Sequence, residues 1–348
     1  PTPRFRPFHA YEGSCEEPRA VSLDASRPPG AYTSRRPALA RALEAGQPAA
    51  LATLYKVEGS APRGPGSQML FTAQDTDAAR IAASGYFSGD CIEGDVASHA
   101  AAVLADSQPR RLHYGSGSPW IDIRLRCGGA LFILVERIAP NCPAAHALLD
   151  HARARTSCRW ISDGTTRRVE AGRGPLLDLE DADAVRLARR FDPPRRLIVS
   201  GGDPGALAAA QLAALSQFET VLVRPDGPAS PPPFPVSQYR REDPARALEE
   251  LGLDRWTAYL GATHEDHHDL GGCLAALRGN AGYVAMIGAR SRAPARLAAL
   301  EAAGARPDEL ERLRLSPGMT GLGKAPWEVA TGIIAEIMQA LNPAGERA

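Results

Sequence analysis

The stretch that decides the fold runs from residue 195 to residue 205 and reads Arg195-Arg196-Leu197-Ile198-Val199-Ser200-Gly201-Gly202-Asp203-Pro204-Gly205. Its first half is a short apolar run of the kind that forms a buried strand. The glycines and Pro204 end this strand, and the alanine-rich segment Gly205–Ser216 that follows is expected to be a helix. A strand, a glycine-rich turn and a helix in this order predict the start of a Rossmann-type α/β domain.

The chain beyond this point continues to alternate between strand and helix patterns. We expect further strands at 220–223, 257–261 and 283–287, and further helices at 244–251, 270–278, 293–303 and 326–341. This order predicts a parallel sheet that is covered by helices on both faces. Residues 195–348 are therefore interpreted as one Rossmann-like domain.

The N-terminal half shows a less regular mixture of the same patterns. We expect helices at 37–45, 92–105 and 143–155, strands at 49–57, 68–71, 121–125 and 130–136 and around Ile81, and a hairpin at 158–170. Residues 35–190 are therefore interpreted as a mixed α/β domain. Residues 1–34 hold six prolines and little apolar periodicity, which predicts an irregular tail. The polar stretch 172–192 is interpreted as the linker between the domains.

Composition and charge exclude several classes of protein. Forty basic residues balance forty acidic ones among 348, whereas a nucleic-acid or anionic-membrane binder has a basic surplus. No apolar run reaches the roughly 18 residues that cross a bilayer, and the first residues lack the apolar centre of a secretory signal. The six cysteines form no CxxC pair, which favours free thiols in a reducing compartment. We therefore expect a cytoplasmic protein.

The turn after the opening strand differs from the usual dinucleotide fingerprint. In the pattern G-x-G-x-x-G, Gly202 and Gly205 occupy the second and third glycine positions, but Ser200 occupies the first. Pro204 removes a backbone N–H, and Asp203 is expected to cap the helix. Arg224 ends the second strand, where it suits a 2′-phosphate better than a bare ribose. Either NAD(P) binds here, or the loop is a structural turn that binds no nucleotide.

Two cysteines lie in glycine-rich surroundings in the first domain. Cys91 follows Gly85-Tyr86-Phe87-Ser88-Gly89-Asp90 at the start of an expected helix, and Cys127 precedes Gly128-Gly129. Glycine lets a ligand or another backbone come close to the sulfur, and a helix N-terminus lowers the pKa of a thiol. Asp90 and Glu93 oppose that effect. The alternative interpretation is two buried structural thiols.

Polar clusters also follow two expected strands of the second domain. The segment 263–269 contains His264, His267 and Asp269, which could bind a metal ion or cap the next helix. Arg290 and Arg292 follow the strand 283–287 and offer two guanidinium groups that suit a phosphate. In a parallel sheet, ligands bind beyond the carboxyl ends of the strands, which favours a functional role for both clusters.

Taken in order, these segments resemble the XdhC/CoxI family, the accessory proteins of xanthine dehydrogenase and related molybdenum hydroxylases. The resemblance covers about Pro37 to Leu341. The segments that carry it are 58–63, 85–96, 127–129, 263–269, 283–292 and 317–336.

The resemblance implies a cytosolic protein that binds the molybdenum cofactor (molybdopterin), protects it, and hands it to a molybdenum hydroxylase apoenzyme. It also implies a homodimer, a link to a cysteine desulfurase, and no catalytic turnover of its own. It implies Cys91 and Cys127 as metal ligands. The expected cofactor-binding residues are Cys91, Cys127, Glu93, Ser60, Arg63, Gly202, Gly205, His264, Arg290 and Arg292, in a cleft between the two domains.

The chain departs from the family pattern at four places. They are Gly89-Asp90 in place of Gly-Gly, Ser200 to Asp203 in place of Gly-x-Gly and His, Arg224 in place of an acidic residue, and Pro317-Gly318-Met319 in place of Pro-x-Gly. These departures leave open a relative with another client enzyme. Two further alternatives are an NAD(P)-dependent oxidoreductase that uses the Rossmann-like domain, and a metal-dependent enzyme built on His264, His267 and Asp269.

Overall fold

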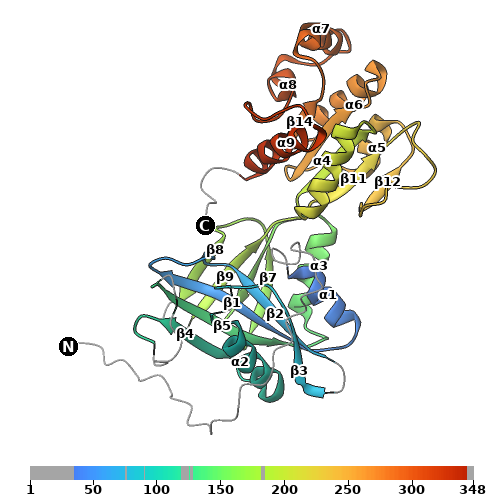
Figure 1. Ribbon diagram of the computed structural model, residues 1–348. Coiled ribbons are helices and arrows are strands. Elements are labelled where there is room, and N and C mark those ends of the chain that lie inside the picture. The colour runs from blue at the N-terminus through green and yellow to red at the C-terminus, as the bar shows by residue number, and fades with distance from the viewer. Residues whose placement is uncertain are drawn as a thin grey trace.

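The computed structural model describes residues 35–74, 77–89, 91–118, 125, 128–181 and 185–342 of the chain. These residues form two domains that meet at residues 192–195 (Figure 1). The first domain consists of two antiparallel sheets with three helices, and the second is a parallel sheet between helices. The predicted fold class, a mixed α/β domain followed by a Rossmann-like domain, is confirmed.

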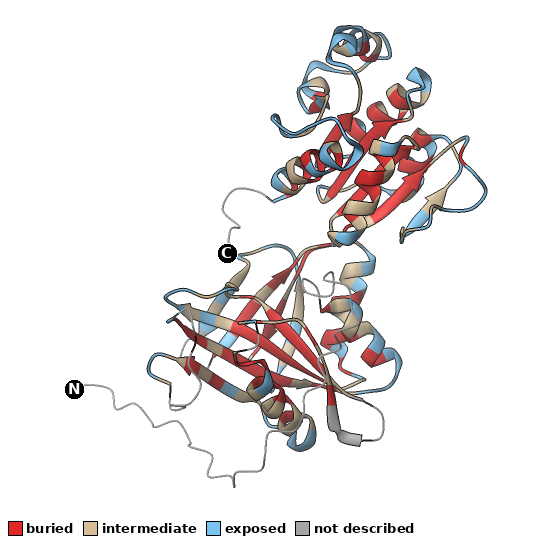
Figure 2. Cartoon of the chain, viewed as in Figure 1, coloured by how far each residue is buried: buried red, intermediate tan, exposed pale blue. Residues whose placement is uncertain are grey.

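The first domain is organised around a five-stranded antiparallel sheet in the order β3-β2-β1-β5-β4. Its strands are β1 (Ala49–Glu58), β2 (Gln68–Gln74), β3 (Asp77–Ser84), β4 (Arg110–Gly115) and β5 (Ala130–Ile138). Helix α2 (Glu93–Asp106) packs its buried residues Val96, Ala100 and Val103 against this sheet. The central strands β1 and β5 are buried along most of their length, as the red ribbons show (Figure 2).

A second, four-stranded antiparallel sheet completes this domain. Its order is β7-β6-β9-β8, from strands β6 (Cys158–Ser162), β7 (Arg167–Ala171), β8 (Leu177–Asp181) and β9 (Arg186–Phe191). Helices α1 (Arg36–Glu44) and α3 (Pro143–Arg153) share a core with both sheets. The fully buried Glu136 accepts hydrogen bonds from the Trp160 indole at 3.2 Å and the Ser162 hydroxyl at 2.7 Å, so the two sheets are joined by a satisfied polar group.

The interpretation of residues 172–192 as a linker is wrong, because this stretch contains strands β8 and β9. Strand β9 lies between β6 and β8, and its Leu187 and Phe191 are buried. Its sequence misleads because three of its six residues are arginines and the apolar residues do not alternate with them. Arg189 is accommodated by stacking its guanidinium 4.0 Å from the Phe191 ring centre.

The second domain contains a six-stranded parallel sheet in the order β12-β11-β10-β13-β14-β15. This is the doubly wound order 3-2-1-4-5-6 in domain numbering. Its strands are β10 (Arg196–Gly201), β11 (Glu219–Val223), β12 (Gln238–Arg240), β13 (Thr257–Ala262), β14 (Tyr283–Met286) and β15 (Leu313–Leu315). The helical segments are α4 (Pro204–Leu215), α5 (Pro244–Leu251), α6 (Asp266–Arg278), η2 (Arg290–Arg292), α7 (Ala293–Ala302), α8 (Pro307–Glu311) and α9 (Pro326–Leu341).

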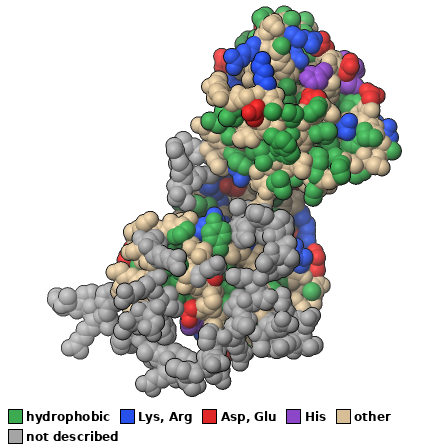
Figure 3. Space-filling view, in the orientation of Figure 1, with side chains coloured by type: hydrophobic (Ala, Val, Ile, Leu, Met, Phe, Trp, Pro, Cys, Tyr) green, Lys and Arg blue, Asp and Glu red, His purple; other side chains and the backbone are tan. Residues whose placement is uncertain are grey.

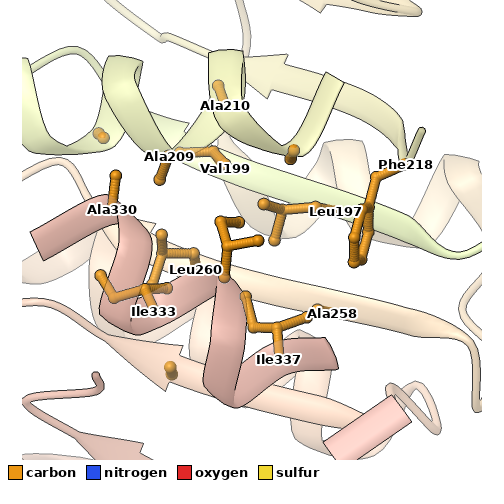
Figure 4. Packing of buried hydrophobic residues seen from close by; sticks show 14 of the residues in the cluster. Leu197, Val199, Ala209, Ala210, Phe218, Ala258, Leu260, Ala330, Ile333 and Ile337 are labelled. Carbon is orange, nitrogen blue, oxygen red and sulfur yellow. The ribbon is translucent and has the colours of Figure 1, made fainter. Parts of the chain in front are cut away.

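Small side chains let helices α4 and α9 pack closely on one face of this sheet. Ala209 and Ala210 of α4 lie opposite the α9 side chains, with Ile333 and Ile337 directed toward Leu260 on the strand below (Figure 4). All five residues are fully buried. The alanine-rich sequence of α4 therefore serves close helix packing on an aliphatic core.

Short elements account for most of the other differences from the sequence expectations. Strands β4, β12 and β15 and helix α8 were not expected, and the last three have only three to five residues each. The strand expected at 121–125 lies mostly outside the described residues, which include only Leu125 of it. The remaining expected helices and strands are confirmed to within a few residues at their ends.

The two domains contact each other at the amino ends of the parallel strands. Arg155 donates hydrogen bonds to Glu219 at 2.6 Å and to Asp254 at 2.6 Å, and these acidic residues lie where β11 and β13 begin. The carboxyl ends of the strands lie at the other end of the sheet, roughly 20 Å away for six residues. The expectation of a single cleft between Cys91 and those carboxyl ends is therefore wrong for one chain.

The packing of α9 predicts a large loss of stability on truncation of its core residues. Ile333→Ala should lower the free energy of unfolding by about 2–5 kcal/mol, because the side chain is fully buried and leaves a cavity. Leu215→Ala, which removes a leucine that is 59% exposed, should change it by less than about 0.5 kcal/mol. Urea unfolding followed by circular dichroism measures both. Equal losses would contradict this description of the core.

Candidate functional site

Several loops of the first domain converge at one end of the strands in its five-stranded sheet. We refer to this row of strand ends as the edge of the sheet. Because neighbouring strands are antiparallel, β1, β3 and β4 end at the same edge where β2 and β5 begin. Glu58 and Gly115, for example, are both in register with Ala130. This edge therefore gathers the loops that contain Ser60 and Arg63, Cys91, and the Gly128-Gly129 pair, which lie far apart in the sequence.

The loop of Ser60 lies directly against Gly129. A Cβ atom at Gly129 would come within 2.3 Å of the Ser60 carbonyl oxygen and 2.8 Å of the Glu58 carbonyl oxygen. Only glycine is compatible with this approach. Cys127, two positions earlier, lies outside the described residues, so its predicted role as a metal ligand stays a prediction.

Arg63 connects this loop to the loop of Cys91. Its guanidinium carbon lies 5.1 Å from the ring centre of Tyr86, a cation–π contact between the two loops. The Nε atom of Arg63 is buried and has no hydrogen-bond partner among the described residues. An unpaired buried donor costs roughly 1–3 kcal/mol, and an anionic ligand is one way to satisfy it.

The loop of Cys91 is folded around the carboxylate of Glu93. This carboxylate accepts backbone N–H bonds from Phe87, Ser88, Gly89 and Ile92 at 2.7–3.2 Å, and the Ser88 hydroxyl at 2.6 Å. Glu93 is only 2% exposed. Burial tends to raise its pKa, but the hydrogen bonds from Ser88, Phe87 and its own backbone outweigh burial and hold the pKa below its usual value. Any role of Glu93 toward a ligand is therefore indirect.

This cage presents Cys91 at the surface of the loop. The Cys91 backbone N–H donates to the Ser88 hydroxyl at 3.0 Å, and its thiol is free and partly exposed. The other free cysteines in the described part of the chain, Cys142, Cys158 and Cys273, are buried. Burial also raises the pKa of the Cys158 thiol to about 11. Among the described cysteines, Cys91 is therefore the accessible thiol of this region.

The glycine-rich turn of the second domain is closed by its own side chains. Asp203 caps α4 by accepting the Ala206 N–H at 2.8 Å, and its other oxygen lies 2.6 Å from Nε2 of His264. The expectation that Asp203 caps the helix is confirmed. The site where a diphosphate would bind therefore already holds a carboxylate of the chain.

Arg224 covers the same turn from the side of β11. A Cβ atom at Gly202 would come within 2.4–2.6 Å of the Arg224 guanidinium, so this side chain lies flat on the backbone. Gly205 has more room, since a Cβ there would lie 3.1 Å from the Asp203 carboxylate. The turn thus brings together Gly202, Gly205 and His264, but Gly202 is covered by Arg224, and Gly205 and His264 lie against Asp203.

The histidine cluster is tied into the fold by hydrogen bonds of its own. Asp269 is buried and accepts hydrogen bonds from Thr263 and from the His264 backbone, which holds His264 in the left-handed region at φ +65°. His268 lies 2.9 Å from Asp243. Histidine and acidic side chains are neighbours on the visible face of this domain (Figure 3). Within the described residues, no three His, Cys, Asp or Glu side chains converge to hold a metal ion.

The two predicted phosphate-binding arginines have different surroundings. Arg292 forms an ion pair with Asp266 at 3.0 Å. Arg290 instead lines a hollow at the carboxyl ends of β14 and β15, together with Lys324 and Glu328. Sequence reasoning missed Lys324 and Glu328. Lys324 could have been noticed in the sequence because lysine is rare in this chain. Only two of the forty basic residues are lysines, and the others are arginines.

Two family profiles match the chain, and together they cover more than half of it. Residues 42–115 match the XdhC and CoxI family, and residues 197–337 match the XdhC Rossmann domain. The chain is 25% identical to the molybdenum cofactor insertion chaperone PaoD of Escherichia coli (strain K12), over 85% of this chain and 84% of that protein. It is 27% identical to a probable xanthine dehydrogenase subunit of Bacillus subtilis (strain 168), over 85% of this chain and 94% of that protein.

A solved structure shares the fold. The crystal structure of a xanthine dehydrogenase from Bacillus halodurans superimposes with a TM-score of 0.67, covering 89% of this chain and 96% of that one. Its sequence is 22% identical, so this likeness concerns the fold alone. In the part of the chain that the structure describes, no helix has the length and apolar character that a membrane span requires.

The caged carboxylate predicts a pH-dependent contribution to stability. Glu93→Gln should lower the free energy of unfolding at pH 7 by about 2 kcal/mol, because an amide replaces a charged acceptor of several N–H groups. In the folded protein the pKa of Glu93 lies below the usual 4.5. The stabilisation by its carboxylate is therefore complete above pH 4.5 and is lost as the pH falls through the folded-state pKa. Urea unfolding of both proteins between pH 7 and pH 3 measures the difference.

Two further measurements make this test specific to the loop. Alkylation of Cys91, followed by peptide mass spectrometry, should become faster in Glu93→Gln as the loop loosens. Glu249→Gln, at an exposed glutamate with no hydrogen bond among the described residues, should leave both measurements unchanged. A stability difference that stays constant down to pH 3 would show that the carboxylate does not organise the loop.

Proposed function

Because the chain belongs to the XdhC and CoxI family, we propose that it is an accessory protein that binds the molybdenum cofactor. In this proposal it protects the cofactor and passes it to a molybdenum hydroxylase of the xanthine dehydrogenase type. The names of its relatives, a molybdenum cofactor insertion chaperone and a probable xanthine dehydrogenase subunit, support this assignment. The cofactor is then cargo, and no turnover by the protein is required.

One observation carries the proposal: the convergence of Cys91, Arg63 and Ser60 at one edge of the first sheet. Molybdenum accepts soft sulfur ligands, and Cys91 offers an accessible thiol. The pterin part carries a phosphate, and the buried Nε of Arg63 lacks a partner among the described residues. A soft ligand and an unsatisfied cation at one edge match the two chemical ends of this cargo.

Cargo must be bound tightly enough to be protected and still be released to a client. At this edge the described residues offer one accessible thiol, and its position depends on a loop held by hydrogen bonds to Glu93. We place Cys127 and Ser60 at the same site as further contacts, since Gly129 packs on Ser60. A site built from loops on a rigid sheet edge suits transient binding.

The remaining expectations belong to this proposal as well. A homodimer, a cysteine desulfurase partner and a cytoplasmic location are proposed from the family resemblance. The alternative of an NAD(P)-dependent oxidoreductase has no geometric support, because Asp203 and Arg224 occupy the turn that would bind the diphosphate.

The proposal predicts that Cys91 is needed to retain molybdenum. The protein and its Cys91→Ser variant are purified from a host that makes the cofactor, and molybdenum and pterin are measured per chain. The variant should retain about tenfold less molybdenum, since even indirect changes around a metal cost roughly 10–100-fold in affinity. Cys15→Ser, at a thiol of the N-terminal segment, is the matched control and should retain the wild-type amount.

The variant Arg63→Gln tests recognition of the phosphate, whereas Cys91→Ser tests ligation of the metal. Arg63→Gln should lower retained pterin and molybdenum together, whereas Arg168→Gln, at an exposed arginine, should not. A wild-type protein that carries neither molybdenum nor pterin, and takes up none when cofactor is supplied, would rule out the carrier function.

A further inference from the structure

A hollow of about 560 Å³ opens at the carboxyl ends of β14 and β15. Its walls come from the turn after β14, the loop after β15 and the first turns of α9. The volume is within the range of small-molecule sites, and the carboxyl ends of parallel strands are where such sites form. The hollow lies at the end of the sheet that is remote from the first domain.

Two cations that form no ion pair among the described residues line the hollow, which also contains one carboxylate, that of Glu328. In the described part of the chain, neither Arg290 nor Lys324 has a hydrogen-bond or ion-pair partner. Arg292, two residues from Arg290, is instead paired with Asp266 at 3.0 Å. A guanidinium and an ammonium on one hollow have the charge and the hydrogen-bond donors that suit a phosphate group.

Glu328 places a hydrogen-bond acceptor on the same hollow. Its Oε2 accepts the Ala325 N–H at 2.9 Å, while Oε1 has no partner among the described residues. A carboxylate can only accept hydrogen bonds, so it favours a ligand with N–H or O–H donors. The 2-amino-4-oxopyrimidine edge shared by pterins and guanine presents two adjacent N–H donors.

Apolar side chains complete the lining. Met319 and Leu322 belong to the lining and are 61% and 47% exposed, which is unusual for such large hydrophobic residues. Val329 lies beside them in the same lining. A flat ring would cover this surface, and the methionine sulfur makes favourable contacts with aromatic rings.

The opposite half of the sheet is unsuited to the same anion. There the helix N-terminus of α4 is occupied by the Asp203 carboxylate, which would repel a phosphate. The contrast between a self-capped turn after β10 and two unpaired cations beyond β14 and β15, all within the described residues, favours the latter as the anion site.

We propose that this hollow binds a phosphorylated ring with a 2-amino-4-oxopyrimidine edge. Arg290 and Lys324 hold the phosphate, Glu328 accepts the ring N–H groups, and Met319 and Leu322 cover the ring. The hollow is a second site, separate from the phosphate contact proposed at Arg63. This inference rests on the proposed function in one respect, since the molybdenum cofactor is a pterin that carries a phosphate. Guanine nucleotides have the same recognition features.

Isothermal titration calorimetry with metal-free ligands tests the site on the chain of residues 1–348. The probes are 6-hydroxymethylpterin phosphate, unphosphorylated 6-hydroxymethylpterin, GMP, AMP and inorganic phosphate. Arg290→Gln and Lys324→Gln should each weaken binding of the pterin phosphate about tenfold, and neither should affect the unphosphorylated pterin. Glu328→Gln should weaken the pterin and GMP but leave inorganic phosphate unchanged.

Arg292→Gln is the matched control, because it removes a neighbouring charge that is already paired. The proposal is overturned if Arg292→Gln weakens binding as much as Arg290→Gln, if AMP binds as tightly as GMP, or if no pterin phosphate binds at millimolar concentration. Whichever of the two probes, pterin phosphate or GMP, binds with the lower Kd shows whether the ligand is a pterin or a guanine nucleotide. Since these probes contain no molybdenum, failure here leaves the Cys91 test of the carrier function standing, and the converse also holds.

Discussion

The hydrogen bonds to the Glu93 carboxylate are the interaction on which the candidate site depends. Four backbone N–H groups and one hydroxyl converge on a side chain that is 2% exposed, and together they fix the course of residues 87–89 and 91–92. A buried charge is tolerable only when donors surround it in this way. The position of Cys91 follows from this cage, and the contact of Arg63 with Tyr86 joins the next loop to it. The sequence spacing of Cys91 and Glu93 is therefore a structural requirement as well as a chemical one.

The charges differ between two positions at the carboxyl ends of the parallel strands in the second domain, the turn after β10 and the region beyond β14 and β15. Asp203 and His264 satisfy each other at the turn after β10, and Arg224 lies over the same backbone. Arg290 and Lys324, at the end of β14 and β15, form no ion pair within the described residues. A domain with dinucleotide-type topology thus has its unpaired positive charge away from the usual diphosphate position. Topology alone would have directed attention to the wrong turn.

Much of the fold could be predicted from the sequence, because long apolar periods and proline at helix starts are local signals. Helices α5 and α9 have the predicted bounds, and both begin with proline. Strand β9 was missed because Arg189 and Arg190 are accommodated by contacts that only the tertiary structure supplies. Strands β12 and β15 are too short for periodicity to show. For the proposed sites, the sequence suggests Cys91, Arg63 and Arg290 as candidates, but the contrast between Arg290 and Arg292 depends on Asp266, which lies 26 residues away.

The contact between the domains keeps the loops around Cys91 in the first domain apart from the hollow around Arg290 in the second. Arg155 holds the amino ends of β11 and β13 against the first domain, so the hollow at the carboxyl ends lies at least a strand length from that contact. Residues this far apart without shared partners contribute additively to binding and stability. The proposed metal-binding edge in one domain and the proposed ring-binding hollow in the other would therefore act as separate modules in a single chain. A ligand that engaged both at once would have to bridge two chains or a change in the angle between the domains, and the Arg155 ion pairs oppose such a change.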